Sequence, residues 1–204
     1  NETFVKPLIE EFEQEFGVRV HLLSGREELI NRIIEERDNV QADLFLSNDA
    51  GAMEHLRLEG LLQSNTSESL QLIDEQFRAP DGSWVGLSAR SRIFIYNKDL
   101  ISSEQLPKTI WELTDPGWAG EFMITHGGNG SMVAHVAALR AIRDDEKTRE
   151  WISGVTENAG AVVSGHTDIR NSVGAGEYKF GLVNNYYYHL SLNEREHNNV
   201  GALY

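Results

Sequence analysis

The chain of 204 residues contains no cysteine, and none of its apolar runs reaches the roughly 18 residues that a membrane-spanning helix needs. Without cysteine it forms no disulfide, thiolate nucleophile, iron–sulfur cluster or cysteine-ligated zinc site. It starts at Asn1 with no signal peptide, as a processed or cut chain would.

Basic residues are scarce: 18 Lys and Arg stand against 32 Asp and Glu, which gives a net charge of −14. A general nucleic-acid binder needs a basic face to neutralise phosphates, and docking on anionic lipid needs one too, so we expect neither partner. Hydrophobic residues make up 40% and charged residues 25% of the chain, which are ordinary values for a folded globular protein.

The pattern of apolar residues predicts an α/β fold. Segments with helical spacing at 4–16, 29–34 and 50–59 alternate with strand-like segments at 18–22 and 42–46. Such alternation predicts a parallel sheet with helices on its faces. Further strands are expected at 85–87, 92–96, 122–124, 162–163, 180–183 and 200–204, and further helices at 132–142, around Trp151, at 167–173 and from Tyr186. A pattern that opens on a helix and closes on a strand is typical of a doubly wound sheet cut at both ends.

Three consecutive tyrosines, Tyr186, Tyr187 and Tyr188, follow the expected strand at 180–183. The carboxyl end of such a strand is where open α/β sheets place their ligands, and a helix N-terminus there favours phenolates. A phenol, with a pKa of about 10, binds metal well only when a hard, highly charged ion displaces its proton, and ferric iron is such an ion. The alternative is that the three rings only pack against a domain interface.

Three other segments are candidates, each with a plain structural alternative. The glycine-rich loop at 126–131 precedes a helix and could present backbone N–H groups to an anion, or it could be an ordinary strand-to-helix turn. The run Ser47-Asn48-Asp49 could offer oxygen ligands or cap a helix. Arg90 and Arg92 lie between two expected strands, where they could bind an anion, brace a hinge or form surface ion pairs.

Enzyme signatures are scarce. Gly86-Leu87-Ser88-Ala89-Arg90 begins like a nucleophile elbow but has no closing glycine. The sequence contains no His-Glu-x-x-His motif, and its seven histidines share no ligand spacing. We therefore expect a protein that is not an enzyme, with a hydrolase or transferase on an α/β sheet, or a domain used only for protein contact, as alternatives.

The run from Gly86 to Asn97 resembles the hinge segment of the periplasmic ferric-ion-binding proteins, the solute-binding components of bacterial ABC iron importers (extracellular solute-binding protein family 1). Asn184-Asn185-Tyr186-Tyr187-Tyr188 resembles their metal-binding tyrosine motif. Residues 42–47 and 60–62 are similar to their first lobe, and residues 113–118 to the start of their second. The similarity covers essentially all 204 residues in order, and the tyrosine motif with the hinge segment is its most specific part.

This resemblance implies a two-lobe periplasmic-binding-protein type II fold that is incomplete at its N- and C-termini. Residues 1–99 would form the first α/β lobe with the crossing strands, without the family's first strand. Residues 100–204 would form the second α/β lobe, which carries the tyrosine motif and lacks the C-terminal return. Lobes of this family close on their ligand like a hinge.

The resemblance also implies a ligand set. Tyr186 and Tyr187 would ligate Fe(III) in the interlobe cleft, and Arg90 and Arg92 would lie in the hinge. Tyr188, Asn48 and Asp49 are further candidates for binding the metal or for supporting its ligands. The positions that match the family's site for a synergistic anion, such as carbonate or phosphate, are Asn129, Gly130, Ser131, His166 and Asn185. Two departures stand out: Asn48 replaces a glutamate ligand of some members, and Ser131 replaces an extra tyrosine of others.

The function implied by the resemblance is iron transport. The protein would be a monomer in the periplasm or another extracytoplasmic location, either free or lipid-anchored, and would deliver ferric iron to the membrane permease of an ABC importer. The alternative is a solute-binding protein of the same fold with an organic or oxyanion ligand.

Overall fold

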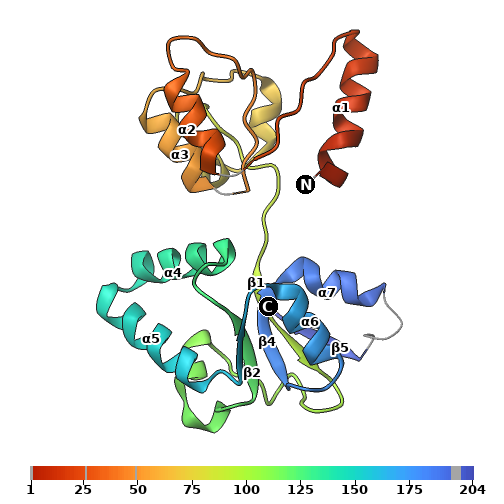
Figure 1. Cartoon of the computed structure of the whole chain (residues 1–204), viewed down its shortest axis with the longest axis vertical. Coiled ribbons are helices and arrows are strands. Elements are labelled where there is room, and N and C mark those ends of the chain that lie inside the picture. The colour runs from red at the N-terminus through yellow and green to blue at the C-terminus, as the bar shows by residue number, and fades with distance from the viewer. Residues whose placement is uncertain (1, 26, 49, 194–198) are drawn as a thin grey trace. The chain divides into compact units, whose positions relative to one another are not determined.

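The computed structural model describes residues 2–25, 27–48, 50–193 and 199–204. The chain forms two compact units, which we call unit 1 (Asn1–Ser88) and unit 2 (Ala89–Tyr204) (Figure 1). The lobe boundary that the resemblance implies, between residues 99 and 100, stays a prediction about the complete family fold.

Unit 1 is built from helices and irregular segments. Helices α1 (Glu2–Phe16), α2 (Glu27–Glu35) and α3 (Ala50–Leu58) confirm the three segments with helical spacing. Gly17 and Gly60 follow α1 and α3 with φ of 63° and 71°, a left-handed conformation that glycine adopts without steric cost and that ends a helix. Two short 3₁₀ helices, Glu68–Leu72 and Glu75–Phe77, interrupt the polar segment that follows.

The strands expected at 18–22, 42–46 and 85–87 do not form, so these three predictions were wrong. In the described part of unit 1 the only β pairing outside helices is an isolated bridge between Arg78 and Val85. A segment with alternating apolar residues becomes a strand only when a neighbouring strand takes up its backbone hydrogen bonds. The side chains of these segments are correspondingly open, with Leu22 51% and Leu44 88% exposed.

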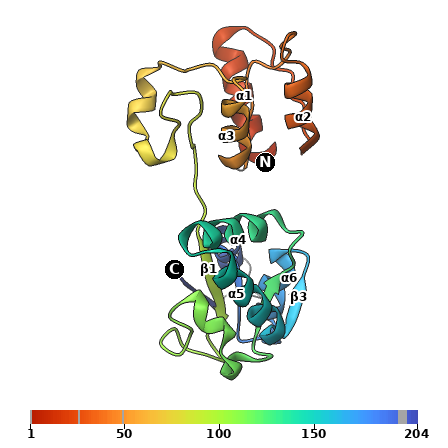
Figure 2. The same cartoon turned by 90° about the vertical axis from the view of Figure 1, so that its left-hand side faces the viewer.

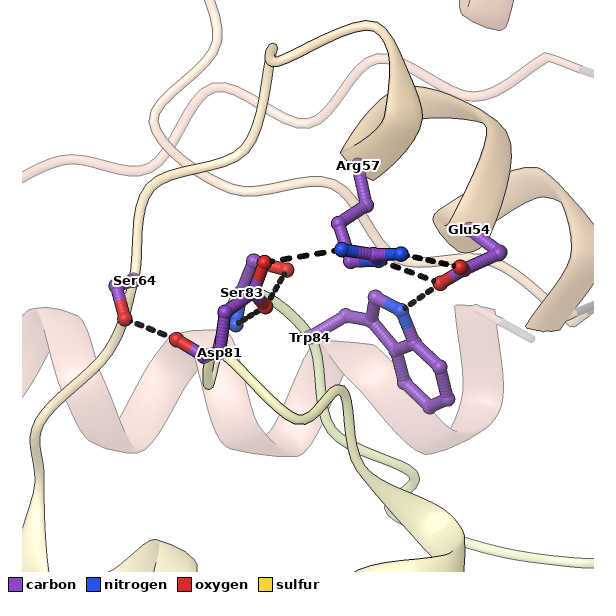
Figure 3. A network of polar contacts seen from close by, with 6 residues as sticks. All are labelled: Glu54, Arg57, Ser64, Asp81, Ser83 and Trp84. Carbon is purple, nitrogen blue, oxygen red and sulfur yellow. Dashed lines mark hydrogen bonds and ion pairs between the residues drawn. The ribbon is translucent and has the colours of Figure 1, made fainter.

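A polar network, rather than a large apolar core, ties α3 to the turn at 79–84 (Figure 3). Arg57 donates from Nε and Nη2 to the Glu54 carboxylate at 2.8 and 2.7 Å, and from Nη1 to Asp81 Oδ2 at 3.2 Å. Trp84 Nε1 donates to Glu54 Oε2 at 3.0 Å. Within the described residues of unit 1, Leu56 and Ala79 are the only buried apolar side chains.

Unit 2 contains a five-stranded mixed sheet of order β3-β2-β4-β1-β5. Its strands are β1 (Arg92–Asn97), β2 (Phe122–Thr125), β3 (Ala161–Val163), β4 (Phe180–Asn184) and β5 (Val200–Leu203), which confirms the five strands expected in this half of the chain. Strands β2, β3 and β4 are parallel, whereas β1 runs antiparallel to both β4 and β5.

Helices cover both faces of this sheet (Figures 1 and 2). Helices α4 (Gly130–Ile142) and α5 (Asp145–Asn158) lie on one face, where Phe122, Phe180 and Trp151 belong to one apolar cluster. Helices α6 (His166–Gly174) and α7 (Asn185–Leu192) lie on the other, where a second cluster includes Ile169 and Val183. Two 3₁₀ helices, Ile110–Thr114 and Pro116–Trp118, form the connector before β2.

None of the helices described is long and apolar enough to cross a membrane.

The alternation of strand and helix in unit 2 brings the carboxyl ends of β2, β3 and β4 to the same end of the sheet. This end carries most of the residues singled out by the sequence.

Candidate functional site

The candidate site lies at the carboxyl ends of the parallel strands of the unit 2 sheet. We call this end of the sheet the edge. Four residues separate β2 from α4, two separate β3 from α6, and α7 follows β4 directly, so three helix N-termini gather at this edge. Strand β1 begins at the same edge because it is antiparallel to β4, and Arg92 pairs in register with Asn184. Helix N-termini carry partial positive charge, so this edge favours anionic groups.

Arg92 crosses this edge and joins two of the helices. Its Nη2 donates to the carbonyl oxygen of Ser131, in the first turn of α4, at 2.6 Å, and its Nη1 lies 2.7 Å from Nε2 of His166, the first residue of α6. Burial lowers the pKa of Arg92 to about 10, so the guanidinium remains charged at neutral pH. The charge of Tyr186 acts in the opposite direction and favours the charged form.

These contacts fix the protonation state of His166. A guanidinium has only donors, so Nε2 of His166 accepts the bond and the neutral ring carries its proton on Nδ1. Burial, followed by the charges of Arg92 and Arg90, lowers the pKa of His166 to about 4. His166 is therefore a neutral ring at pH 7, with its Nδ1–H as the remaining donor.

The start of α4 is held by short polar side chains. Asn129 accepts a bond from Ser131 N through Oδ1 at 3.0 Å and donates from Nδ2 to Ser164 O at 3.1 Å, so it caps α4 and links it to the loop after β3. Buried Asn184 donates from Nδ2 to Ser131 Oγ at 3.1 Å. The loop expected to bind an anion is thus a capped helix start bound to the ends of two neighbouring strands.

The three tyrosines lie in the first turn of α7 and differ in their surroundings. The rings of Tyr186 and Tyr187 lie 4.5 Å apart between centroids, at 32° to each other. The Tyr187 and His166 rings are perpendicular, with 5.1 Å between centroids and 89° between planes. Tyr186 is 40% exposed, whereas Tyr187 and Tyr188 pack partly against the core cluster beneath α6 and α7. Tyr186 is therefore the most accessible phenol of the three.

The Tyr187 phenol keeps its proton at neutral pH. Burial, then its hydrogen bond with Tyr186 and the neighbouring Tyr186 charge, raise the pKa of Tyr187 above its ordinary value. A hydrogen bond with Thr167 and the charge of Arg170 oppose this shift. A ligand that needs the Tyr187 phenolate must therefore displace a proton.

The structure brings together most of the residues that the sequence singled out. Asn129, Gly130, Ser131, His166, Asn185, Tyr186 and Tyr187 all lie at the helix starts along this edge, and Asn185 accepts from Ser91 N through Oδ1 at 3.2 Å. Arg90 lies two residues before β1. Asn48 is an exposed residue of unit 1, and Asp49 lies outside the described residues. Among the residues that were described, no three His, Asp or Glu side chains gather into a group that could hold a metal ion.

Sequence reasoning missed the part played by Asn184. Asn184 directly precedes α7, yet its side chain makes no capping hydrogen bond and instead reaches Ser131. A buried asparagine at the end of an apolar strand is the signal that could have indicated this contact, because buried amides are normally hydrogen-bonded.

A separate groove lies on the opposite face of the sheet from the tyrosines. It has a volume of about 470 Å³ and lies between α4, α5 and the edge strand β3, with mostly apolar walls that include Val133, Ile152 and Val162. It contains none of the three tyrosines and none of the polar contacts described above.

Comparison with known proteins places this geometry in a family. The family model for the bacterial extracellular solute-binding proteins matches residues 39–201. The chain belongs to this family. As a member, it shares a fold whose proteins bind solutes, and this is not a family of enzymes. This confirms the expected family of solute-binding proteins and, with it, the expected α/β fold class.

The relatives include proteins named for iron. The chain is 30% identical over 188 residues to the Fe(3+)-binding periplasmic protein of Serratia marcescens. This match covers 92% of this chain and 55% of that protein. It is 33% identical over 190 residues to iron uptake protein A1 of Synechocystis, spanning 92% of this chain and 51% of the relative. The chain thus spans about half the length of the curated relatives it matches.

Solved structures agree on the fold. Iron-bound HitA from Pseudomonas aeruginosa matches with a TM-score of 0.84 and 27% identity, covering 97% of this chain and 64% of HitA. The Trichodesmium protein IdiA (FutA), in complex with iron and citrate, matches with a TM-score of 0.83 and 28% identity, covering 97% of this chain and 65% of that protein.

Proposed function

We propose that this protein binds ferric iron with the phenolates of Tyr186 and Tyr187 and delivers it to the membrane permease of an ABC importer. The observation that carries the proposal is the position of the two rings, 4.5 Å apart in the first turn of α7, at an edge where three helices begin. Phenolate oxygens are hard donors, and hard donors suit a small trivalent ion.

The electrostatics of the edge support phenolate rather than phenol ligands. The N-terminus of α7 carries partial positive charge, and Arg92, which remains charged at neutral pH, begins β1 at the same edge. Tyr187 is the harder group to ionise, since burial and its neighbour raise its pKa. The metal itself would supply the energy that removes this proton, as happens when a cation binds an ionisable ligand.

A synergistic anion, such as carbonate or phosphate, would complete the shell. The candidate donors are the backbone N–H of Gly130 at the start of α4, the Ser131 hydroxyl, the Nδ1–H of His166 and the side chain of Asn185. Asn129 would act indirectly, because its side chain is already used to cap α4 and to reach Ser164. Citrate accompanies iron in the Trichodesmium relative, so an organic anion is a further candidate.

The names of the relatives support iron as the cargo and the periplasm as the location. A permease partner follows from the same class of protein, since a periplasmic solute-binding protein hands its ligand to a membrane transporter. Tyr188, Asn48 and Asp49 remain candidates for a further ligand or for support of the tyrosine pair.

The experiment is a titration of the purified protein with chelated ferric iron, followed in the visible range for a tyrosinate-to-iron absorption band. We expect a band in the wild type that weakens in Tyr186→Phe and in Tyr187→Phe. Tyr178→Phe, a change at a tyrosine that precedes β4 at the opposite end of the sheet, serves as the control and should leave the band unchanged. A folded wild-type protein without any band would contradict the proposal and favour an organic or oxyanion ligand on the same fold.

A further inference from the structure

Arg92 is an unusual residue for the place it occupies. It is half-buried at the start of a central strand, and its pKa shows the cost of that burial. Among the residues that the structure describes, it forms no ion pair with a carboxylate, and its two bonds go to a carbonyl oxygen and a neutral imidazole. A buried cation is normally compensated by an opposite charge, so this arrangement calls for an explanation.

Its position supplies one, because each of its two bonds ends in the first turn of a helix that begins at the same edge as α7. Ser131 lies in the first turn of α4, and His166 opens α6. The His166 and Tyr187 rings in turn are in perpendicular contact, 5.1 Å between centroids. A chain of direct contacts therefore runs from the guanidinium of Arg92 through His166 to the Tyr187 ring.

We propose that Arg92 is a positioning residue, which orients His166 against Tyr187 and thereby sets the tyrosine pair for ligation. This inference rests on the proposed function. By donating to Nε2, Arg92 fixes the rotation and the tautomer of the imidazole, and the perpendicular contact then limits the rotation of the Tyr187 ring. Arg92 also leaves the Nδ1–H of His166 as the ring's remaining donor.

The same contacts give Arg92 a second consequence. One guanidinium holds the first turn of α4, where the anion would bind, and the first residue of α6, which touches the tyrosine. Removing it should therefore loosen both halves of the site together. Residues that orient metal ligands without touching the metal typically change affinity by roughly 10- to 100-fold when mutated.

The first test needs no iron. In the protein without metal, ¹⁵N chemical shifts of the His166 ring should show an unprotonated Nε2 and a protonated Nδ1. Arg92→Met, which removes all donors, should give a mixture of tautomers. Arg92→Lys keeps one donor and should retain the wild-type tautomer. A wild-type ring protonated at Nε2 would overturn the inference whatever the protein binds.

The second test measures ferric affinity. We expect Arg92→Met to bind chelated ferric iron roughly 10-fold or more weakly than the wild type, with a shifted tyrosinate band, and Arg92→Lys to lose less. Arg149→Gln, which removes the same charge from an exposed position on α5, should stay within about twofold, as expected for a change at a distant site. Equal losses in Arg92→Lys and Arg92→Met would overturn the inference.

A double-mutant cycle tests whether Arg92 acts through His166. His166→Phe keeps an aromatic edge next to Tyr187 but has no acceptor for Arg92. In that background Arg92→Met should lower affinity by clearly less than it does in the wild type, because the link to His166 is already broken and only the bond to Ser131 is left to lose. Fully additive losses would overturn the inference. If the wild type binds no ferric iron, the proposed function fails, and the tautomer measurement decides the role of Arg92 by itself.

Discussion

Gly181 of β4 lies so close to Ile169 of α6 that a Cβ atom at position 181 would be 2.2 Å from Ile169 Cγ2. This close approach sets the height of α6 above the sheet. Because His166 is the first residue of α6 and meets Tyr187 edge-on, the absence of a side chain at position 181 also determines where the imidazole lies.

We expect Gly181→Ala to destabilise unit 2 and to disturb the site. The added methyl group must push Ile169 and α6 away from the sheet, and overpacking of this kind costs about 1–3 kcal/mol. Chemical denaturation measures the loss. Gly127→Ala is the matched control, since a Cβ there meets no atom within 4 Å. Equal stability of the two variants would contradict the packing argument.

Proton release should accompany ferric binding. Both phenols must ionise, and burial raises the pKa of Tyr187, so affinity should increase with pH across the neutral range. Release of two protons corresponds to a gain of up to about 100-fold per pH unit. Isothermal titration in buffers of different ionisation enthalpy counts the protons released. Tyr187→Phe should release one proton fewer than the wild type, and an equal count would contradict ligation by Tyr187.

Ferric affinity should also depend on the anion supplied. We expect tighter binding with carbonate, phosphate or citrate than in a weakly coordinating buffer. Asn129→Ala should reduce this gain, because it removes both the α4 cap and the link to Ser164. Asn39→Ala, in an exposed segment of unit 1, is the control. A gain of the same size in Asn129→Ala would show that the α4 loop does not hold the anion.

Acid should loosen the network of unit 1 at a low pH. The hydrogen bonds from Arg57 and Trp84 lower the pKa of Glu54 from 4.5 to about 2. The contribution of this carboxylate is therefore complete above about pH 4.5 and is lost as the pH falls through about 2. The ¹⁹F resonance of fluorinated Trp84 follows the change. In Glu54→Gln the resonance should lose this titration, and an unchanged titration would mean that another group causes it.

Unit 2 should lose stability at a milder pH. Burial lowers the pKa of His135 from 6.5 to about 4, and the same shift applies to His166. Between these values the unfolded chain takes up protons that the folded chain does not, so stability falls as the pH drops from about 6.5 to about 4. His135→Leu should flatten part of this dependence in thermal unfolding followed by tryptophan fluorescence, since the Trp151 ring contacts His135 in the wild type. An identical slope in the variant would contradict the assignment.

The fold of unit 2 was predictable because its strands are continuous apolar runs that end at polar residues. Phe180-Gly181-Leu182-Val183 and Arg92-Ile93-Phe94-Ile95-Tyr96 both form strands as expected, since each finds a partner strand in the same sheet. The period-two run at 18–22 has an equally good pattern but forms no strand in unit 1. Periodicity describes what a segment prefers, whereas a strand also needs a neighbour.

The site was predictable in part. Adjacency in sequence was enough to place Tyr186 and Tyr187 together, because consecutive residues of a helix start share one end of it. The contact between Arg92 and His166 joins residues 74 positions apart, and Asn184 reaches Ser131 across 53 positions. Such contacts depend on the antiparallel insertion of β1 beside β4, which no local pattern encodes.

That insertion also determines the order in which the sheet can assemble during synthesis. Strand β1 pairs on one side with β4, through Arg92 and Asn184, and on the other with β5, through Phe94 and Leu203. Both partners are made about 90 or more residues after β1, so closing these pairings carries the entropy of a long loop and slows folding. Until residue 203 has left the ribosome, β1 has an unpaired edge, and an apolar strand with an open edge is what chaperones bind and what aggregates.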